Sequence, residues 1–295
     1  MRWLLLGDDL LRLISLSPLA ASHWCLDVDD LATCSDAAES GGGVCASTGL
    51  SELGLERLGE AESLRSRSPA DALLLVDAFS GISAARRALQ LLGVAPGSHI
   101  SLEVDEVAQS IVASHFQGAR ELGDITEVTI KKLKEAVADN PHIKHILLVA
   151  GFPCQDLSGA NPAAKGLTGN RSSLLHQALG LLRELLPAAF PGIEIEAILE
   201  NVSSMKAAYR DEISALCDTA PYKLCPSDVW PDLRPRFWWL TCALDNHRYL
   251  EIEFKDGYAK GRLLGRTREV KEFLPKGSQV ALSFVAFPTF CASSD

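Results

Sequence analysis

The sequence predicts an α/β protein built on a layered sheet, and three observations lead to this fold class. Between residues 71 and 202, short apolar runs alternate with segments of helical periodicity. Polar residues and glycines gather directly after the apolar runs, where a layered α/β sheet carries its functional loops. After residue 236, two more strand-like runs at 237–244 and 249–254 have no helix between them, so the strand–helix alternation ends there.

The predicted elements follow this alternation in chain order. Gly93 closes the first helix and Asn140-Pro141 ends the third, because a helix needs a stop signal that glycine and proline supply. Strands are expected at 73–79, 99–105, 145–150 and 195–199, and helices at 82–92, 106–116, 129–139 and 174–186.

Composition and charge set the class of protein. The chain has 295 residues, of which 47% are hydrophobic and 22% charged, an ordinary composition for one core or two domains. The formal net charge of −10 is unfavourable for a nucleic-acid binder. Residues 1–70 hold 11 acidic and 5 basic residues, and residues 71–295 hold 27 and 23. More than half of the negative excess therefore lies outside the region of strand–helix alternation.

The eight cysteines form no Cys-x-x-Cys pair, which favours reduced thiols in an intracellular protein and no metal site. The set His23, Cys25, Cys34 and Cys45 is spaced too loosely for a typical zinc site. Residues 1–70 are expected to be a partly ordered extension of unknown role. Their apolar runs are too short to cross a bilayer, so no membrane association is predicted.

Four predicted strand ends carry residues suited to chemistry. They are Asp77-Ala78-Phe79-Ser80-Gly81, Pro153-Cys154-Gln155, Glu200-Asn201-Val202 and Arg234-Pro235-Arg236. A glycine turn between a strand and a helix lets backbone N–H groups approach a ligand. A cysteine in the loop after a buried strand is placed like a nucleophile.

In this order, over about residues 72–242, the motifs resemble those of the DNA (cytosine-5) methyltransferases. The sequence of residues 156–167 looks most like that of the eukaryotic de novo branch. The resemblance implies a Rossmann-like class I S-adenosylmethionine-dependent methyltransferase sheet that ends in antiparallel strands. It divides the chain into an extension at 1–70, a catalytic domain at 71–245 and a short, truncated recognition region at 246–295. It also implies DNA as partner and a nuclear location.

The resemblance assigns the chemistry to a few residues. Cys154 would add to carbon 6 of cytosine, which makes carbon 5 able to attack the methyl group. Glu200 would protonate or hydrogen-bond ring nitrogen 3, and Asn201 would fix the loop. Arg234 and Arg236 are expected to point the same way from one strand and to orient the base. The base must be flipped out of the duplex, and the loop 155–169 is expected to close over it.

The resemblance also places S-adenosylmethionine. Glu103, about twenty residues after the glycine turn, fits an acid that binds ribose hydroxyls. The pair Asp124-Ile125 matches the position that contacts adenine. Ser83 and Ala84 depart from the family, because many members have glycines there. The complete predicted cofactor set is Asp77, Phe79, Ser80, Gly81, Ile82, Glu103, Val104, Asp124, Ile125 and Leu174.

Alternatives stay open at this point. The segment 261–267 resembles either the last motif of the family or the motif that precedes the recognition region. The acidity and the short C-terminal region fit a weakly active or inactive subunit that binds a homologous methyltransferase. A third possibility is a tRNA cytosine-5 methyltransferase, although the Cys-Phe-Thr element of that branch is not found.

Overall fold

The structure is a computed structural model that describes residues 32–38, 41–47, 70–158, 169, 174–229, 233–241 and 250–264. In these ranges the backbone forms a two-stranded antiparallel sheet, from β1 (Ala32–Ala38) and β2 (Gly41–Ser47), and a nine-stranded sheet. The strands of the larger sheet are β3 (Ala70–Ala78), β4 (Pro96–Leu102), β5 (Ala119–Glu121), β6 (His145–Gly151), β7 (Glu194–Val202), β8 (Tyr222–Leu224), β9 (Arg236–Leu240), β10 (Leu250–Lys255) and β11 (Tyr258–Leu263).

The order of the larger sheet confirms the predicted class I methyltransferase architecture. The strands lie in the order β10-β11-β8-β9-β7-β6-β3-β4-β5, and the five from β7 to β5 are parallel. Strand β9 runs antiparallel to both of its neighbours, β7 and β8, as the resemblance implied. Within this sheet the chain begins at the central strand β3, adds β4 and β5 on one side, and then places β6 on the other side of β3. This reversal creates a switch point between β3 and β6, the position where open α/β sheets bind ligands.

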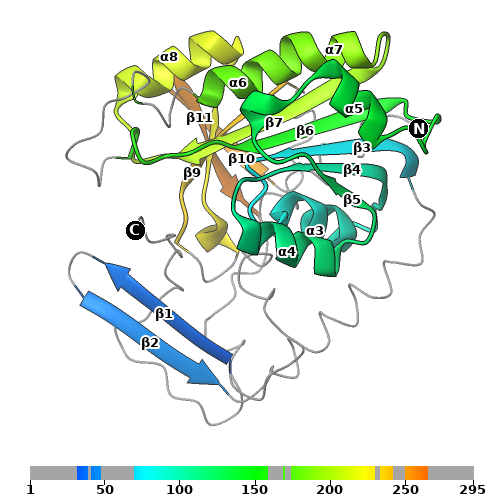
Figure 1. Ribbon diagram of the computed structural model, residues 1–295. Coiled ribbons are helices and arrows are strands. Elements are labelled where there is room, and N and C mark those ends of the chain that lie inside the picture. Colours follow the sequence, from blue (N-terminus) through cyan, green and yellow to red (C-terminus); the bar gives the residue numbers. More distant parts are fainter. Residues whose placement is uncertain are drawn as a thin grey trace.

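Helices cover both faces of this sheet, so the architecture is a three-layer sandwich (Figure 1). Alternate residues of the central strands face opposite layers: Leu74 and Val76 join one hydrophobic cluster, whereas Leu73 and Leu75 join the other. The helices are α3 (Ala84–Leu91), α4 (Glu106–His115), α5 (Ile130–Ala136), α6 (Leu174–Gly180), α7 (Leu186–Ala189) and α8 (Ala207–Cys217), with 3₁₀ turns at Ile125–Glu127 (η1) and Pro226–Asp228 (η4).

The larger predicted elements are confirmed, with shifts at their ends. The predicted strand at 99–105 lies three residues earlier, because Pro96 begins β4, a position where a strand tolerates proline. The predicted helix at 174–186 is wound as α6, a π-helical turn at Leu181–Leu185 and α7. Helix α8 was not predicted, and Ile213 is its one buried residue. Strands β5 and β8 were also missed, because three residues carry no readable period.

Strands β10 and β11 continue the same sheet, because β11 pairs in parallel with β8. The sheet thus extends past residue 245, and the division of the chain at residues 70 and 245 stays a prediction. Among the residues that the structure describes, no helix has both the length and the apolarity to cross a bilayer. The residues His23 and Cys25 lie outside the described ranges, as do the side chains of Cys34 and Cys45.

Candidate active site

The predicted site residues lie along one edge of the sheet. Because β7, β6, β3, β4 and β5 are parallel neighbours, the residues at their carboxyl ends form a row. In spatial order this row is Glu200, Cys154, the Asp77–Gly81 turn, Glu103 and Glu121. Strand β9 runs the other way, so its first residue, Arg236, lies at the same edge beside Val202. Cys154 and the glycine turn therefore flank the switch point.

Glu200 and Arg236 form the best-defined contact of the row. Nε of Arg236 lies 2.7 Å from Oε1 of Glu200, and the two side chains are 14% and 20% exposed. The strand register explains the contact: Glu200 pairs with Trp238, and Arg236 lies two residues earlier on the antiparallel strand, on the same face. An ion pair in this partly dry position fixes the orientation of the carboxylate.

The loop that carries Cys154 begins directly beside this pair. Gly151 is the register partner of Glu200, and a Cβ atom on Gly151 would lie 3.4 Å from Oε2 of Glu200. The buried amide of Asn201 donates from Nδ2 to the carbonyl oxygen of Phe152 at 2.8 Å, and its Oδ1 accepts from the backbone N–H of Val202. Asn201 thus ties the Pro-Cys loop to β7.

Cys154 is half-buried and forms no disulfide. The N–H groups of Leu157 and Ser158 both donate to its carbonyl oxygen, at 2.9 and 2.8 Å, so a helical turn follows it. Gly169 is buried against the side chain of Asp156, which brings the end of the predicted closing loop next to its beginning. The stretch 159–168 of that loop lies outside the described residues. Burial raises the pKa of Cys217 to about 12, so that thiol is unsuited to act as a nucleophile.

One expectation for the arginine strand was wrong in detail. Arg234 precedes β9 rather than lying on it, so the same-direction argument from a shared strand does not apply. Pro235 supplies the reason, because proline has no N–H group to donate to the neighbouring strand. Its carbonyl accepts from Ser203 N–H and from Nη1 of Arg236 just before the strand begins. Trp238 and Trp239 are both buried, and Nε1 of Trp239 donates to Oγ of Ser214. These tryptophans are therefore core residues.

The turn after β3 has an unusual backbone. Phe79, Gly81 and Ser83 all have positive φ, at 56°, 51° and 62°. Glycine adopts this region at little cost, whereas a non-glycine residue is strained there by roughly 1–2 kcal/mol. Ser83 therefore keeps a glycine-like backbone at a position where many family members have glycine.

A buried hydrogen-bond chain offsets this strain. Oγ of Ser83 donates to Oδ2 of Asp77 at 2.5 Å and lies 3.3 Å from Nε2 of His99. Burial raises the pKa of Asp77 to about 7; the Ser83 hydrogen bond opposes the increase, and the charges of Glu103 and Glu121 add to it. Burial, with the charge of Arg86, lowers the pKa of His99 to about 3, so this ring is neutral. Because the Ser83 hydroxyl donates its hydrogen bond to Asp77, it can only accept from His99. The contact therefore requires the neutral tautomer that carries its proton on Nε2.

Glu103 stands at the end of β4, and its carboxylate organises the backbone. Oε2 accepts from the N–H of Gly81 at 2.7 Å, while Oε1 accepts from the N–H groups of Val104 and Asp105 at 2.8 and 3.0 Å. The acid predicted for ribose hydroxyls therefore also holds the glycine turn against the end of β4. Each carboxylate oxygen accepts up to two hydrogen bonds, so Oε2 keeps capacity for a hydroxyl donor.

The remaining predicted cofactor residues differ in burial. Oδ1 of Asp124 caps the 3₁₀ turn η1 by accepting from Thr126 N–H at 2.8 Å, and Ile125 is buried. Val104 is 66% exposed, a large apolar side chain left open at this edge. Ile82 and Leu174 are half-buried, each beside a different hydrophobic cluster. An open apolar side chain among oriented polar groups suits a nucleoside ligand.

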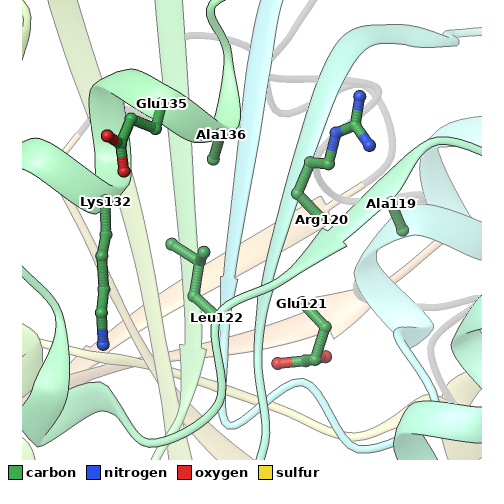
Figure 2. Close-up of a pocket in the computed structure, with 7 residues that line it drawn as sticks. All are labelled: Ala119, Arg120, Glu121, Leu122, Lys132, Glu135 and Ala136. Atoms are coloured by element: carbon green, nitrogen blue, oxygen red, sulfur yellow. The ribbon is translucent and has the colours of Figure 1, made fainter.

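Sequence reasoning missed Glu121, the last residue of β5. Its carboxylate contacts segments that carry predicted cofactor residues, but a lone glutamate before Leu122-Gly123 gives no signal in the sequence. Glu121 also lines a hollow of about 480 Å³ between β5 and α5, together with Arg120, Lys132 and Glu135 (Figure 2). In the described part of the chain, no cluster of three His, Cys, Asp or Glu residues is arranged to hold a metal ion.

Comparisons with known proteins agree with the motifs. Residues 73–218 match the family model described as C-5 cytosine-specific DNA methylase. Type II methyltransferase M2.BsuMI of Bacillus subtilis is 33% identical over 131 residues, which are 44% of this chain and 29% of that protein. Type II methyltransferase M.HhaI of Haemophilus parahaemolyticus is 32% identical over 115 residues, or 39% and 31%. The chain thus spans about a third of the length of these curated relatives.

Among solved structures, DNMT2 of Spodoptera frugiperda aligns with 67% of this chain and 57% of its own, at 19% identity and a TM-score of 0.45.

Proposed function

Because residues 73–218 match the family model described as C-5 cytosine-specific DNA methylase, we propose that the chain transfers a methyl group from S-adenosylmethionine to carbon 5 of cytosine in DNA. The observation that carries the proposal is the placement of the Glu200–Arg236 pair one strand away from the Cys154 loop, at the switch point of the sheet. A carboxyl group held by an arginine beside a loop cysteine suits nucleophilic addition to an electron-poor ring.

In the proposed reaction, the Cys154 thiolate adds to carbon 6 of a flipped-out cytosine, which forms a carbon–sulfur bond. Glu200 donates a hydrogen bond or a proton to ring nitrogen 3, where the displaced electron pair accumulates. Carbon 5 then takes the methyl group, which S-adenosylmethionine supplies. S-adenosylhomocysteine is the product that would remain from the donor. Water takes the carbon 5 proton, and the electron pair of that bond re-forms the double bond between carbons 5 and 6 while the carbon–sulfur bond breaks. The thiolate and 5-methylcytosine are released, and any proton given to ring nitrogen 3 returns to Glu200.

The chain's own residues fit the roles around this reaction. Arg236 orients Glu200 through its Nε, and Asn201 holds the start of the cysteine loop. Arg234 is proposed to contact the base or a nearby phosphate from the segment before β9. The loop 155–169 is proposed to close over the flipped base and exclude water.

The cofactor residues also fit. Backbone N–H groups of the turn after β3 lie at the N-terminal end of α3, and Glu103 keeps hydrogen-bonding capacity for ribose hydroxyls. Asp124 and Ile125 are proposed to contact adenine, and the exposed Val104 to pack on it, with Phe79, Ile82 and Leu174 enclosing the ligand. The proposed set keeps Asp77, Ser80 and Gly81 as the residues that shape the turn.

A trapping experiment tests the proposal. The chain is incubated with labelled S-adenosylmethionine and DNA that carries 5-fluorocytosine, which blocks release because fluorine cannot leave as a proton does. The expected result is a covalent protein–DNA adduct that is lost in Cys154→Ala and kept in the matched variant Cys225→Ala. In the unaltered chain, the Cys225 thiol contacts Ser227 and is not part of the proposed site. No adduct in the unaltered chain, or an adduct that survives Cys154→Ala, would refute the mechanism.

The net charge of −10 favours a second candidate, a methyltransferase-like subunit that binds a homologous methyltransferase. This candidate would be supported if the chain alone bound S-adenosylmethionine tightly but transferred no methyl group, and if adding a homologous methyltransferase restored transfer.

A relationship to the eukaryotic de novo branch and a nuclear location are also proposals. Comparing labelled transfer to DNA and to tRNA separates the remaining alternative.

A further inference from the structure

We infer that Glu121 is a positioning residue for the methyl donor: its one carboxylate holds together the three loops that carry the cofactor residues. The inference rests on the proposed function, because it concerns the pocket of that reaction. Glu121 belongs to neither the predicted site nor the catalytic motifs. It would act through Glu103, Ser80 and Asp124 rather than by touching the reacting atoms.

The two carboxylate oxygens of Glu121 together reach three parts of the proposed pocket. Oε1 accepts from the backbone N–H of Glu103 at 3.2 Å and from that of Gly123 at 2.9 Å. Oε2 accepts from Oγ of Ser101 at 2.6 Å, and Ser101 in turn lies 2.8 Å from Oγ of Ser80. One side chain thus reaches the end of β4, the turn before η1 and, through Ser101, the turn after β3.

These three connections match the three predicted parts of the cofactor pocket. Gly123 immediately precedes Asp124, so its position sets where the adenine-contacting pair begins. The Glu103 N–H fixes the residue whose carboxylate also bonds Gly81. Ser80 and Ser101 are buried, so their hydroxyls depend on each other and on Glu121 for hydrogen bonds. Because ligand affinity depends on how well the site is organised before binding, a shared anchor for three loops affects affinity directly.

The neighbouring Glu135 provides a contrast on the same hollow (Figure 2). Its side chain is 64% exposed and lies 3.8 Å from Lys131 in an (i, i+4) pair on α5. Such an exposed pair contributes little to stability and connects no loops. Glu121 is exposed as well, but its carboxylate accepts from two backbone N–H groups and one buried hydroxyl, so it connects separate loops. The two glutamates therefore form a matched pair for a test.

Two conservative substitutions separate reach from charge. Glu121→Asp keeps the negative charge but is one methylene too short to span the three loops. Glu121→Gln keeps the length and the carbonyl oxygen that can accept from Glu103 and Gly123. The readouts are the dissociation constant of S-adenosylhomocysteine by calorimetry, the KM for S-adenosylmethionine against kcat, and amide exchange of 79–84 and 122–126. Glu135→Asp is the control.

A positioning role predicts that Glu121→Asp weakens S-adenosylhomocysteine binding about tenfold, the effect of one or two lost hydrogen bonds. KM should rise in proportion, kcat should change little, and exchange should increase in both segments. Glu121→Gln and Glu135→Asp should bind within about threefold of the unaltered chain. Equal binding by all four proteins overturns the inference, and so does a loss in Glu121→Gln larger than in Glu121→Asp, which would indicate charge rather than reach.

The two levels of the hypothesis fail in different ways. If the unaltered chain does not bind S-adenosylhomocysteine, the proposed function fails and the inference fails with it. If the unaltered chain binds it and forms the 5-fluorocytosine adduct while Glu121→Asp binds equally well, only the inference on Glu121 fails.

Discussion

The two halves of the sheet edge use their charged residues differently. On the side of β3, β4 and β5, the carboxylates of Glu103 and Glu121 bond mainly to backbone N–H groups, so the side chains shape loops. On the side of β6, β7 and β9, Glu200 bonds to the side chain of Arg236, so two functional groups orient each other. The first half organises loops, and the second orients a pair of charged side chains.

This difference teaches where a substitution should act. A change in the half with β4 and β5 loosens loops before the ligand arrives, and it should appear as weaker cofactor binding. A change in the Glu200–Arg236 half alters groups that are proposed to face the reacting base, and it should appear in kcat. If the two halves were coupled as one unit, both constants would change together in every variant.

The largest effect is expected from Glu200→Gln. This substitution keeps the size of the side chain but removes the acid, so kcat should fall roughly 10²- to 10⁴-fold. The dissociation constant of S-adenosylhomocysteine should stay within about twofold, because no cofactor loop is touched. Single-turnover kinetics measure the rate of methyl transfer. The control is Glu196→Gln on the same strand, because the Glu196 carboxylate accepts from Thr241 and is not part of the proposed site. Full activity in Glu200→Gln would remove the acid from the mechanism.

Arg236→Lys should have the next largest effect. Lysine keeps the charge but cannot reproduce the Nε contact at 2.7 Å, so Glu200 loses its fixed orientation. We expect kcat to fall about tenfold, with unchanged cofactor affinity. The exposed pair Arg262–Glu251, at 3.5 Å, offers Arg262→Lys as a control with no expected effect on turnover. A change in cofactor affinity without a change in kcat would contradict the division between the halves.

Asp77→Asn sharpens the comparison through pH. The folded-state pKa of Asp77 is about 7, above its ordinary value of 3.8, so its favourable contribution is present at acidic pH and is lost as pH rises through 7. Between pH 5.5 and 8, unaltered protein should lose about 2 kcal/mol from this group, and Asp77→Asn should not. Denaturant unfolding at both pH values measures the difference. A constant gap between the two proteins would show that Asp77 titrates normally.

The smallest effect is expected at Ser83. Ser83→Ala removes the hydroxyl between Asp77 and His99 and keeps the left-handed backbone, so it should cost about 1–2 kcal/mol of unfolding free energy. Ser83→Gly also loses the hydroxyl but relieves the strain at φ 62°, so it should be about 1 kcal/mol more stable than Ser83→Ala. Chemical denaturation of both variants gives the ranking, and the opposite order would mean that the turn is not strained.

The order of motifs along the chain determined much of the candidate site. Apolar runs at 73–79, 145–150 and 195–199 identified three neighbouring strands, and crossover connections place their ends at one edge. For this reason Cys154, Glu200 and the Asp77–Gly81 turn could be brought together from sequence alone. Motif spacing carried this information because parallel strands separated by helices have few possible arrangements.

Contacts between particular side chains were decided only by the tertiary structure. Strand register selected Arg236 rather than Arg234 as the partner of Glu200, and it depends on the pairing of residues far apart in the chain. The same holds for Glu121, whose partners lie on three loops, and for Ser83, whose strained backbone depends on Asp77 and His99. A local pattern predicts where a strand ends, whereas hydrogen bonds across the sheet need the positions of all its strands.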